Sequence, residues 1–307
     1  MPKTIITAAL TGAIHVPSQS PYLPITPEEL GIEAEKAWRA GAAIVHVHAR
    51  NPVDGRPSSD LATFRQIADE IKKRCSVVIC FSTGGALWMT AEERVAAVPA
   101  LRPELASLNT GSINFVIYPM AEKISSFKFD WEEPYLNGTA DLIFANTYKT
   151  IGIFAKTMYD NGTVPELEVY DVGHINTIRF MVERGVLQVP VYIQFVMGIQ
   201  GGIPATVSNL VLLYETACRL LGNDFRWSVC AAGRSQLPLG NLALLLGGNV
   251  RVGLEDSLFA TRGQLAKSSA EQVEKIRTIA ETLGLEIASS DEARDILGLK
   301  GDAAVGF

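Results

Sequence analysis

Long blocks of like charge are absent from this chain of 307 residues, in which 27 basic residues face 33 acidic ones and the net charge is −6. Without a basic stripe, neither nucleic acid nor an anionic membrane surface is expected as the main partner. No apolar run approaches the length of a membrane span, and the first residues lack the apolar core of a signal peptide. We therefore expect a cytoplasmic protein.

Cysteine and histidine are scarce. The four cysteines form no C-x-x-C pair, which favours buried thiols in a reducing compartment over a disulfide framework. Of the four histidines, two lie at positions 46 and 48, at the end of the apolar run "AAIV". Such a concentration of a rare residue type suggests a specific role for this pair.

Apolar runs alternate along the chain with amphipathic stretches that carry helix signals. Thr26, Pro27 and Glu29 form a capping box with proline at the first helical position, and Thr90 with Glu93 repeats the box. Strands are predicted at 4–10, 42–48, 76–82, 104–109, 166–171, 189–196, 225–232 and 249–255. Further helices are predicted near 60–73, 146–160, 174–184, 205–221, 235–246 and 268–283.

Eight β-α repeats in a chain of this length predict a (β/α)8 TIM barrel that forms a single domain over residues 1–307. The alternative is an open doubly wound sheet, but no G-x-G-x-x-G follows the first strand. The long connection near 112–145 is typical of a lid or an interface arm. A short helix at 291–297 is interpreted as a C-terminal appendage.

His46 and His48 point the same way, because residues i and i+2 of a strand share a face. Both then face the barrel interior near its C-terminal mouth, where barrel enzymes hold their active sites. A hydrogen-bonded pair of core histidines is the alternative to a metal site. Glu255 ends the eighth predicted strand. In a closed barrel only the first strand lies between the eighth strand and the second strand, which carries the two histidines. The three side chains can therefore form a zinc site that leaves room for substrate.

Other polar side chains are expected at the same mouth. Glu168 is a rival metal ligand or a partner of one, and Arg251 needs a carboxylate such as Asp256 because a buried charge must be paired. Ser82, which opens "STGG", and two residues that share a face of the fourth strand complete the set of candidates for substrate contact. These two residues are Ser107 and Asn109.

Two glycine-rich turns follow the sixth and seventh strands, "MGIQGGIP" at 197–204 and "AAGRSQ" at 231–236. Such turns can cradle phosphates, which makes Gly201, Gly202 and Arg234 candidates for a phosphate-bearing cofactor. The alternative is that these glycines only satisfy the geometry of the turns.

Several stretches together resemble the bacterial β-keto acid cleavage enzymes, whose type activity is 3-keto-5-aminohexanoate cleavage. The resemblance extends over nearly the whole chain, and the motifs are specific in combination although each alone is weak. They are "TGA" 11–13, "LPITPEE" 23–29, "HVHAR" 46–50, "DGRPS" 54–58, "STGG" 82–85, "PELASLNTGSINF" 103–115, "PELEVY" 165–170, "QFVMGIQGG" 194–202 and "RVGLED" 251–256.

The resemblance implies a zinc-dependent barrel enzyme that converts a β-keto acid and acetyl-CoA into acetoacetate and a new acyl-CoA. It also implies a homotetramer. The positions that carry over as zinc ligands are His46, His48 and Glu255, and those that match the remaining site positions are Ser82, Arg251 and Asp256. Asp256, held by Arg251, is the candidate base, and Ser82 is a candidate donor to the oxyanion.

One departure from the family concerns the substrate. Members that cleave the amino compound resemble one another in an acidic residue after "TGA", whereas this chain has Ile14. We therefore expect a substrate with a neutral acyl chain, or a quaternary ammonium that stacks on Trp88, Phe127 and Trp131. The other functions considered are a zinc hydrolase of the amidohydrolase type, a metal aldolase and a non-catalytic ligand-binding barrel.

Overall fold

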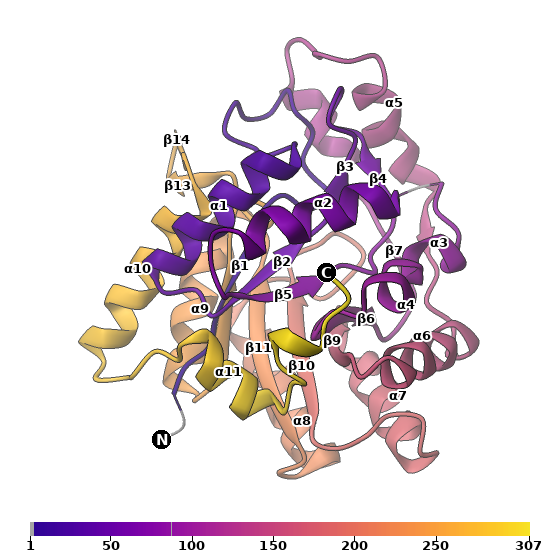
Figure 1. The fold of residues 1–307 in the computed structure, drawn as a ribbon, viewed down its shortest axis with the longest axis vertical. Coiled ribbons are helices and arrows are strands. Elements are labelled where there is room, and N and C mark those ends of the chain that lie inside the picture. The colour runs from indigo at the N-terminus through magenta and orange to yellow at the C-terminus, as the bar shows by residue number, and fades with distance from the viewer. Residues whose placement is uncertain (1–2, 87) are drawn as a thin grey trace.

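In residues 3–86 and 88–307, which the computed structural model describes, eight parallel strands close into a barrel with helices around it (Figure 1). Around the ring the strands follow the order β1-β12-β11-β10-β9-β6-β5-β2. The prediction of a TIM barrel is confirmed. The strands are β1 (Ile6–Ala9), β2 (Ile44–Val47), β5 (Val78–Phe81), β6 (Leu105–Asn109), β9 (Val164–Val169), β10 (Val191–Met197), β11 (Phe225–Ala231) and β12 (Asn249–Val252).

The predicted helices are all present. At the first, Thr26 Oγ1 accepts from the amide of Glu29 at 3.2 Å, and the Glu29 carboxylate accepts from the amide of Thr26 at 3.0 Å, so the capping box is confirmed. The helices are α1 (Pro27–Ala40), α2 (Leu61–Lys72), α3 (Ala91–Val95), α4 (Ala97–Leu101), α5 (Glu132–Asn137), α6 (Tyr148–Asp160), α7 (Val172–Glu183), α8 (Val207–Leu221), α9 (Gln236–Leu245), α10 (Ser269–Thr282) and α11 (Ser290–Leu297). Among the described helices, none is both long and apolar enough to cross a membrane.

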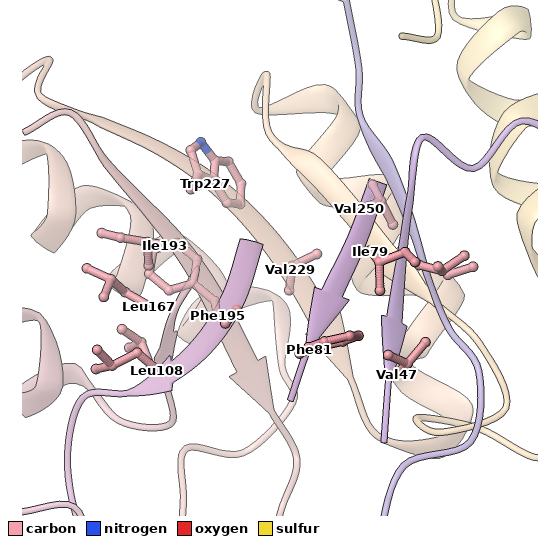
Figure 2. Close-up of a cluster of buried hydrophobic side chains, with 14 of the residues drawn as sticks. Val47, Ile79, Phe81, Leu108, Leu167, Ile193, Phe195, Trp227, Val229 and Val250 are labelled. Atoms are coloured by element: carbon pink, nitrogen blue, oxygen red, sulfur yellow. The ribbon is translucent and has the colours of Figure 1, made fainter. Parts of the chain in front are cut away.

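Successive side chains along each strand point alternately to the outside and to the inside of the barrel. One set of side chains points outward and packs against the helices. Figure 2 shows members of this buried set, among them Phe81, Phe195 and Trp227. The rings of Phe195 and Trp227 lie 5.5 Å apart. The alternate set points into the barrel, and toward the C-terminal ends of the strands it becomes polar, as with His46 and Glu166. The same alternation that builds the outer core therefore places polar groups inside the barrel.

Helix α11 covers the N-terminal end of the barrel and is more than an appendage. Ala293 packs in one buried cluster with Ile5, Ile44 and residues from three further strands. The guanidinium of Arg294 donates to both carboxylate oxygens of Glu104, at 2.9 and 3.0 Å, and this pair anchors the helix to the strand side of the barrel. One mouth is thus closed, which leaves the C-terminal mouth for function.

The connection at 112–145 is folded. It contains the antiparallel strands β7 (Ile113–Asn114) and β8 (Ile143–Phe144), the 3-10 helices η1 (Tyr118–Lys123) and η2 (Gly138–Asp141), and helix α5, which lies at the top of Figure 1. The Tyr135 hydroxyl donates to the carbonyl of Ala13 at 2.8 Å, and Trp131 Nε1 donates to the carbonyl of Asp54 at 3.2 Å. These bonds hold the connection over the C-terminal mouth as a lid.

Arg50 ties two loops of this mouth together. It lies in β3 (Ala49–Arg50), which pairs with β4 (Pro57–Ser58), and its guanidinium is fully buried. It donates to Thr11 Oγ1 and to the carbonyls of Thr11, His15 and Gly55 at 2.8–3.1 Å. The loop after β1 is thereby fixed against the segment that follows β2.

Candidate active site

A cavity of about 580 Å³ opens at the C-terminal ends of the barrel strands, beneath the lid. Its size is in the range of small-molecule sites. Its floor is polar and includes His48, Arg251 and Asp256, whereas the lid contributes mainly apolar groups to its wall. The apolar wall includes Phe115, Ile117, Met120, Tyr135, Leu142 and Phe144.

Two imidazoles and one carboxylate converge at the floor. The Nε2 atoms of His46 and His48 lie 3.2 Å apart, and Glu255 Oε1 lies 3.3 Å from His48 Nε2 and 3.7 Å from His46 Nε2. Ligands held at 2.0–2.1 Å around a tetrahedral zinc are separated by about 3.3 Å, so this triangle has the size that such an ion requires. Glu255 Oε2 is buried and has no hydrogen-bond partner among the described residues. The predicted ligands thus lie together, and one oxygen of Glu255 is free to bind a cation.

The protonation states of His46 and Glu255 also suit a cation. Burial lowers the pKa of His46 well below its usual value, so its ring is neutral. Burial alone would raise the pKa of Glu255, but the Arg251 guanidinium and the two imidazoles lower it well below the usual range. A neutral imidazole and an ionised carboxylate are the forms that bind zinc.

The route by which Glu255 reaches this site differs from the prediction. The eighth strand ends at Val252, and the chain then turns, with the amides of Asp256 and Ser257 donating to the carbonyl of Gly253. The turn, and not strand alternation up to residue 255, brings the carboxylate inward. Gly12 leaves room for it, because φ is +59° there and a Cβ would lie 2.3 Å from Glu255 Cγ. This close approach explains the glycine of "TGA".

Arg251 connects the groups of the floor. It donates to both oxygens of Asp256 at 2.9 Å, and its Nη2 lies 2.8 Å from Glu255 Oε1. Burial raises the pKa of Asp256 to about 6 although the guanidinium counteracts it. The predicted pair is therefore present, with the Asp256 carboxylate at the cavity wall.

The remaining substrate candidates divide into two groups. Ser82, Glu168 and Ile14 line the cavity, and burial raises the pKa of Glu168 to about 8. Ser107 and Asn109 lie inside the barrel but not at the cavity wall. Ser107 Oγ accepts from the amide of Thr83 at 3.2 Å and so supports the loop that carries Ser82.

Close packing explains the two glycines of the turn after β10. At Gly201 φ is +98° and a Cβ would lie 1.6 Å from the carbonyl oxygen of Asn114, while a Cβ on Gly202 would lie 2.8 Å from that of Tyr170. Neither glycine lines the cavity, whereas the turn after β11 reaches it at Gly233, beside the exposed Arg234. Of the two turns, only the second presents a cation next to the cavity.

Three interior groups were not selected from the sequence as site residues. His15 lines the cavity, and burial lowers its pKa to about 4. Glu166 lies beneath His46, with a pKa that burial raises to about 7, and Gln194 donates to it at 3.2 Å. The usable signal for Gln194 was a polar residue in the apolar run of β10, and that for Glu166 was its place on the same face of β9 as Glu168. His15 lies in the loop after β1, which carries no such signal. His174 is no ligand candidate, because its Nδ1 accepts from the amide of Tyr170.

Comparisons with known proteins identify the family of the chain. The family described as beta-keto acid cleavage enzyme matches residues 3–299. A relative from Paraburkholderia graminis, named 3,5-dioxohexanoate:acetyl-CoA acetone transferase, is 47% identical and is aligned over 99% of this chain and 98% of its own length. A 3-keto-5-aminohexanoate cleavage enzyme from Fusobacterium nucleatum is 39% identical over 98% of this chain and 99% of its own.

Solved structures support the barrel. A binary complex of ObcA with oxaloacetate superposes with a TM-score of 0.71 at 22% identity, over 91% of this chain and 68% of that one. At this level of identity the likeness concerns the fold.

Replacing Gly201 by alanine should destabilise the protein, because the new Cβ would collide with the carbonyl of Asn114 and φ is positive. The expected loss is about 2 kcal/mol or more, measured by chemical denaturation. Gly185→Ala is the matched control, since φ there is +69° with open space around it, and it reports the backbone strain alone. Equal losses in the two variants would contradict a packing role for Gly201.

Proposed function

The chain belongs to the β-keto acid cleavage enzyme family, and we propose that it is a zinc-dependent member that transfers an acyl group from a β-keto acid to CoA. The products are acetoacetate and a new acyl-CoA, and the co-substrate is acetyl-CoA. The observation that carries the proposal is the convergence of His46, His48 and Glu255 beneath a cavity with a paired Asp256 at its wall.

The reaction exchanges two acyl groups on one carboxymethyl unit. Loss of a proton from C2 of R–CO–CH2–COO⁻ gives a carbon nucleophile, which bonds to the acetyl carbonyl and displaces CoA thiolate. The thiolate then bonds to the original acyl carbonyl, the old bond between C2 and C3 breaks, and a proton returns to C2. The balance is one β-keto acid and acetyl-CoA giving acetoacetate and R–CO–SCoA, without an oxidant or reductant.

The residues at the floor have distinct tasks. When bound to His46, His48 and Glu255, Zn²⁺ supplies Lewis-acid polarisation of the keto oxygen, which is worth several kcal/mol. Asp256 accepts the C2 proton and returns it, and the bidentate contact with Arg251 keeps its carboxylate aimed at the cavity. Ser82 donates a hydrogen bond to the oxygen on which negative charge develops.

The acyl chain of the substrate lies toward the lid. Ile14 and the apolar lid residues line this part of the cavity, and no cation-pairing carboxylate stands at position 14. This arrangement favours a neutral acyl chain, in line with the substrate that names the Paraburkholderia relative. A quaternary ammonium is the second choice. The rings expected to hold it, those of Trp88, Phe127 and Trp131, do not line the cavity. Trp88 and Trp131 pack at an angle against Tyr135, with ring centroids 5.5 and 5.7 Å from its ring, and the Arg56 guanidinium already lies 4.4 Å from the Trp88 ring. These rings would have to turn toward the cavity to bind such a cation.

CoA enters from the side of the turn after β11. Arg234 there is an exposed cation beside the cavity wall, suited to a phosphate, and Gly201 and Gly202 shape the neighbouring turn. Ser107 acts on the substrate through the loop of Ser82, which it supports. Asn109 stays a candidate for substrate contact from inside the barrel, where its buried side-chain amide has no hydrogen-bond partner among the described residues. We further propose a cytoplasmic homotetramer, in keeping with the resemblance and with cysteines that are all free.

The zinc assignment predicts that His48→Ala loses most of the bound metal and the activity while the fold persists, because two ligands hold the ion less tightly than three. Elemental analysis of the purified variant and of the parent protein measures it, and the far-ultraviolet circular dichroism spectrum serves as the control for folding. Full zinc occupancy in a folded His48→Ala protein would falsify the assignment.

The base assignment predicts that Asp256→Asn lowers kcat by about 100-fold or more, since general bases contribute about 10²–10⁴-fold. The zinc content should stay at the level of the parent, because the ligands are untouched. A metal-loaded Asp256→Asn enzyme with normal turnover would sink the role of Asp256.

Specificity follows from Ile14. Leaving a buried ammonium unpaired costs several kcal/mol, and each 1.4 kcal/mol is about tenfold, so kcat/KM for 3-keto-5-aminohexanoate should be about 100-fold or more below that for β-ketohexanoate. Dehydrocarnitine should rank between them. Coupled assays with the three acids and acetyl-CoA decide the order, and Ile14→Glu should raise the rank of the amino compound. If the amino compound is the best substrate of the unmodified enzyme, the interpretation of Ile14 is wrong.

A further inference from the structure

One nitrogen of His46 has no use in the site described so far. Nε2 faces His48 and Glu255, whereas Nδ1 points to the other side, into the barrel. Nδ1 is fully buried and has no hydrogen-bond partner among the described residues. The nearest carboxylate oxygen is Glu166 Oε2, at 4.0 Å. A buried N–H without an acceptor costs about 1–3 kcal/mol, so this separation calls for an explanation.

Glu166 is held from its other side. It lies in β9 with no exposed surface, and its Oε1 accepts from Gln194 Nε2 at 3.2 Å. The thiol of Cys80 lies 3.7 Å from Oε2, the oxygen that faces His46. Gln194 Nε2 also lies 3.1 Å from Ser228 Oγ. The carboxylate is thus fixed in position, and its one strong donor contact is on the side away from the histidine.

The contacts form a closed ring across the barrel. Gln194 Oε1 accepts from Arg251 Nη1 at 2.9 Å, and Arg251 Nη2 lies 2.8 Å from Glu255 Oε1. Glu255 returns to His46, so five side chains from β2, β9, β10, β12 and the turn after β12 meet one another. An ionised Glu166 carboxylate has no hydrogen to donate, so the NH2 group of Gln194 must face it. The amide oxygen of Gln194 then faces Arg251.

We propose that Glu166 is a positioning residue that acts through both His46 and Gln194. When a metal ion is bound, the 4.0 Å gap closes and Glu166 accepts the Nδ1–H of His46. This bond fixes the tautomer in which Nε2 is free to bind the ion. Through Gln194 it holds the guanidinium that pairs with Asp256. Metal-bound histidines usually donate their second N–H to such a group. The inference rests on the proposed zinc site, since its first effect is on metal affinity.

The test compares Glu166→Gln with Glu168→Gln. Both residues are buried glutamates of β9, but Glu168 faces the cavity and lies 3.6 Å from Arg251 Nη1 instead of facing His46. Zinc dissociation constants are measured by competition with a chromophoric chelator. Glu166→Gln should bind zinc about 10–100-fold more weakly, the usual effect of losing such a partner. Glu168→Gln should keep the affinity of the parent protein.

A second measurement needs no substitution. In zinc-loaded protein with 15N-labelled histidine, His46 should appear as the Nδ1–H tautomer with a strongly deshielded proton, assigned with His46→Gln. A Glu166→Gln protein that binds zinc as tightly as the parent would overturn the inference. Two other results would also overturn it. In one, His46 of the unmodified protein carries no proton on Nδ1. In the other, the unmodified protein binds a second metal ion that the Glu166→Gln protein does not bind. An unmodified protein that binds no zinc at all would instead refute the proposed function.

Discussion

The buried charge of Arg251 is the interaction on which the rest of the site depends. A guanidinium inside a barrel is stable only with carboxylates around it, and Asp256 and Glu255 both contact it. These two carboxylates outweigh its single charge, and burial raises the pKa of Glu168, which favours its neutral form. The floor therefore carries a net negative charge when no ligand is bound. A divalent cation together with a substrate carboxylate would restore the balance.

The lid turns this charged floor into a reaction chamber. Its apolar side chains cover one side of the cavity, and Tyr135 fastens it to the loop after β1. That loop carries Gly12, whose missing side chain lets Glu255 approach, and Ile14, which contributes to the wall. The same short segment therefore shapes the metal site on one side and the acyl pocket on the other. Exclusion of water by the lid strengthens every electrostatic contact at the floor.

Local patterns predicted much of this arrangement. Alternation was enough to turn His46 and His48 to one face, and closure of a barrel placed the last strand two positions from theirs. Glu255 was identified although the strand stops at Val252, because the turn carries its side chain to the same side. Patterns with a period of two residues in a strand, or of one turn in a helix, survive such local changes.

Contacts between distant segments could not be predicted in the same way. The glycines at 201 and 202 read as a phosphate turn because the sequence does not show that Asn114 and Tyr170 come so close. The ring through Glu166 and Gln194 was likewise hidden, since it needs the side-chain directions of several strands at once. The lid was recognised by its length alone. Its fold depends on two-residue strands and 3-10 segments that carry no strong periodic signal.

X-ray absorption at the zinc edge tests the central claim most directly, because it reports the atoms that surround the metal in the purified protein. A zinc ion held by His46, His48 and Glu255 should have nitrogen and oxygen neighbours only, at about 2.0–2.1 Å, with two imidazole rings in the outer scattering. A β-keto acid should change this pattern by adding oxygen. A sulfur neighbour at about 2.3 Å would contradict the account, since it would place the metal at Cys80 instead of at His48 and Glu255.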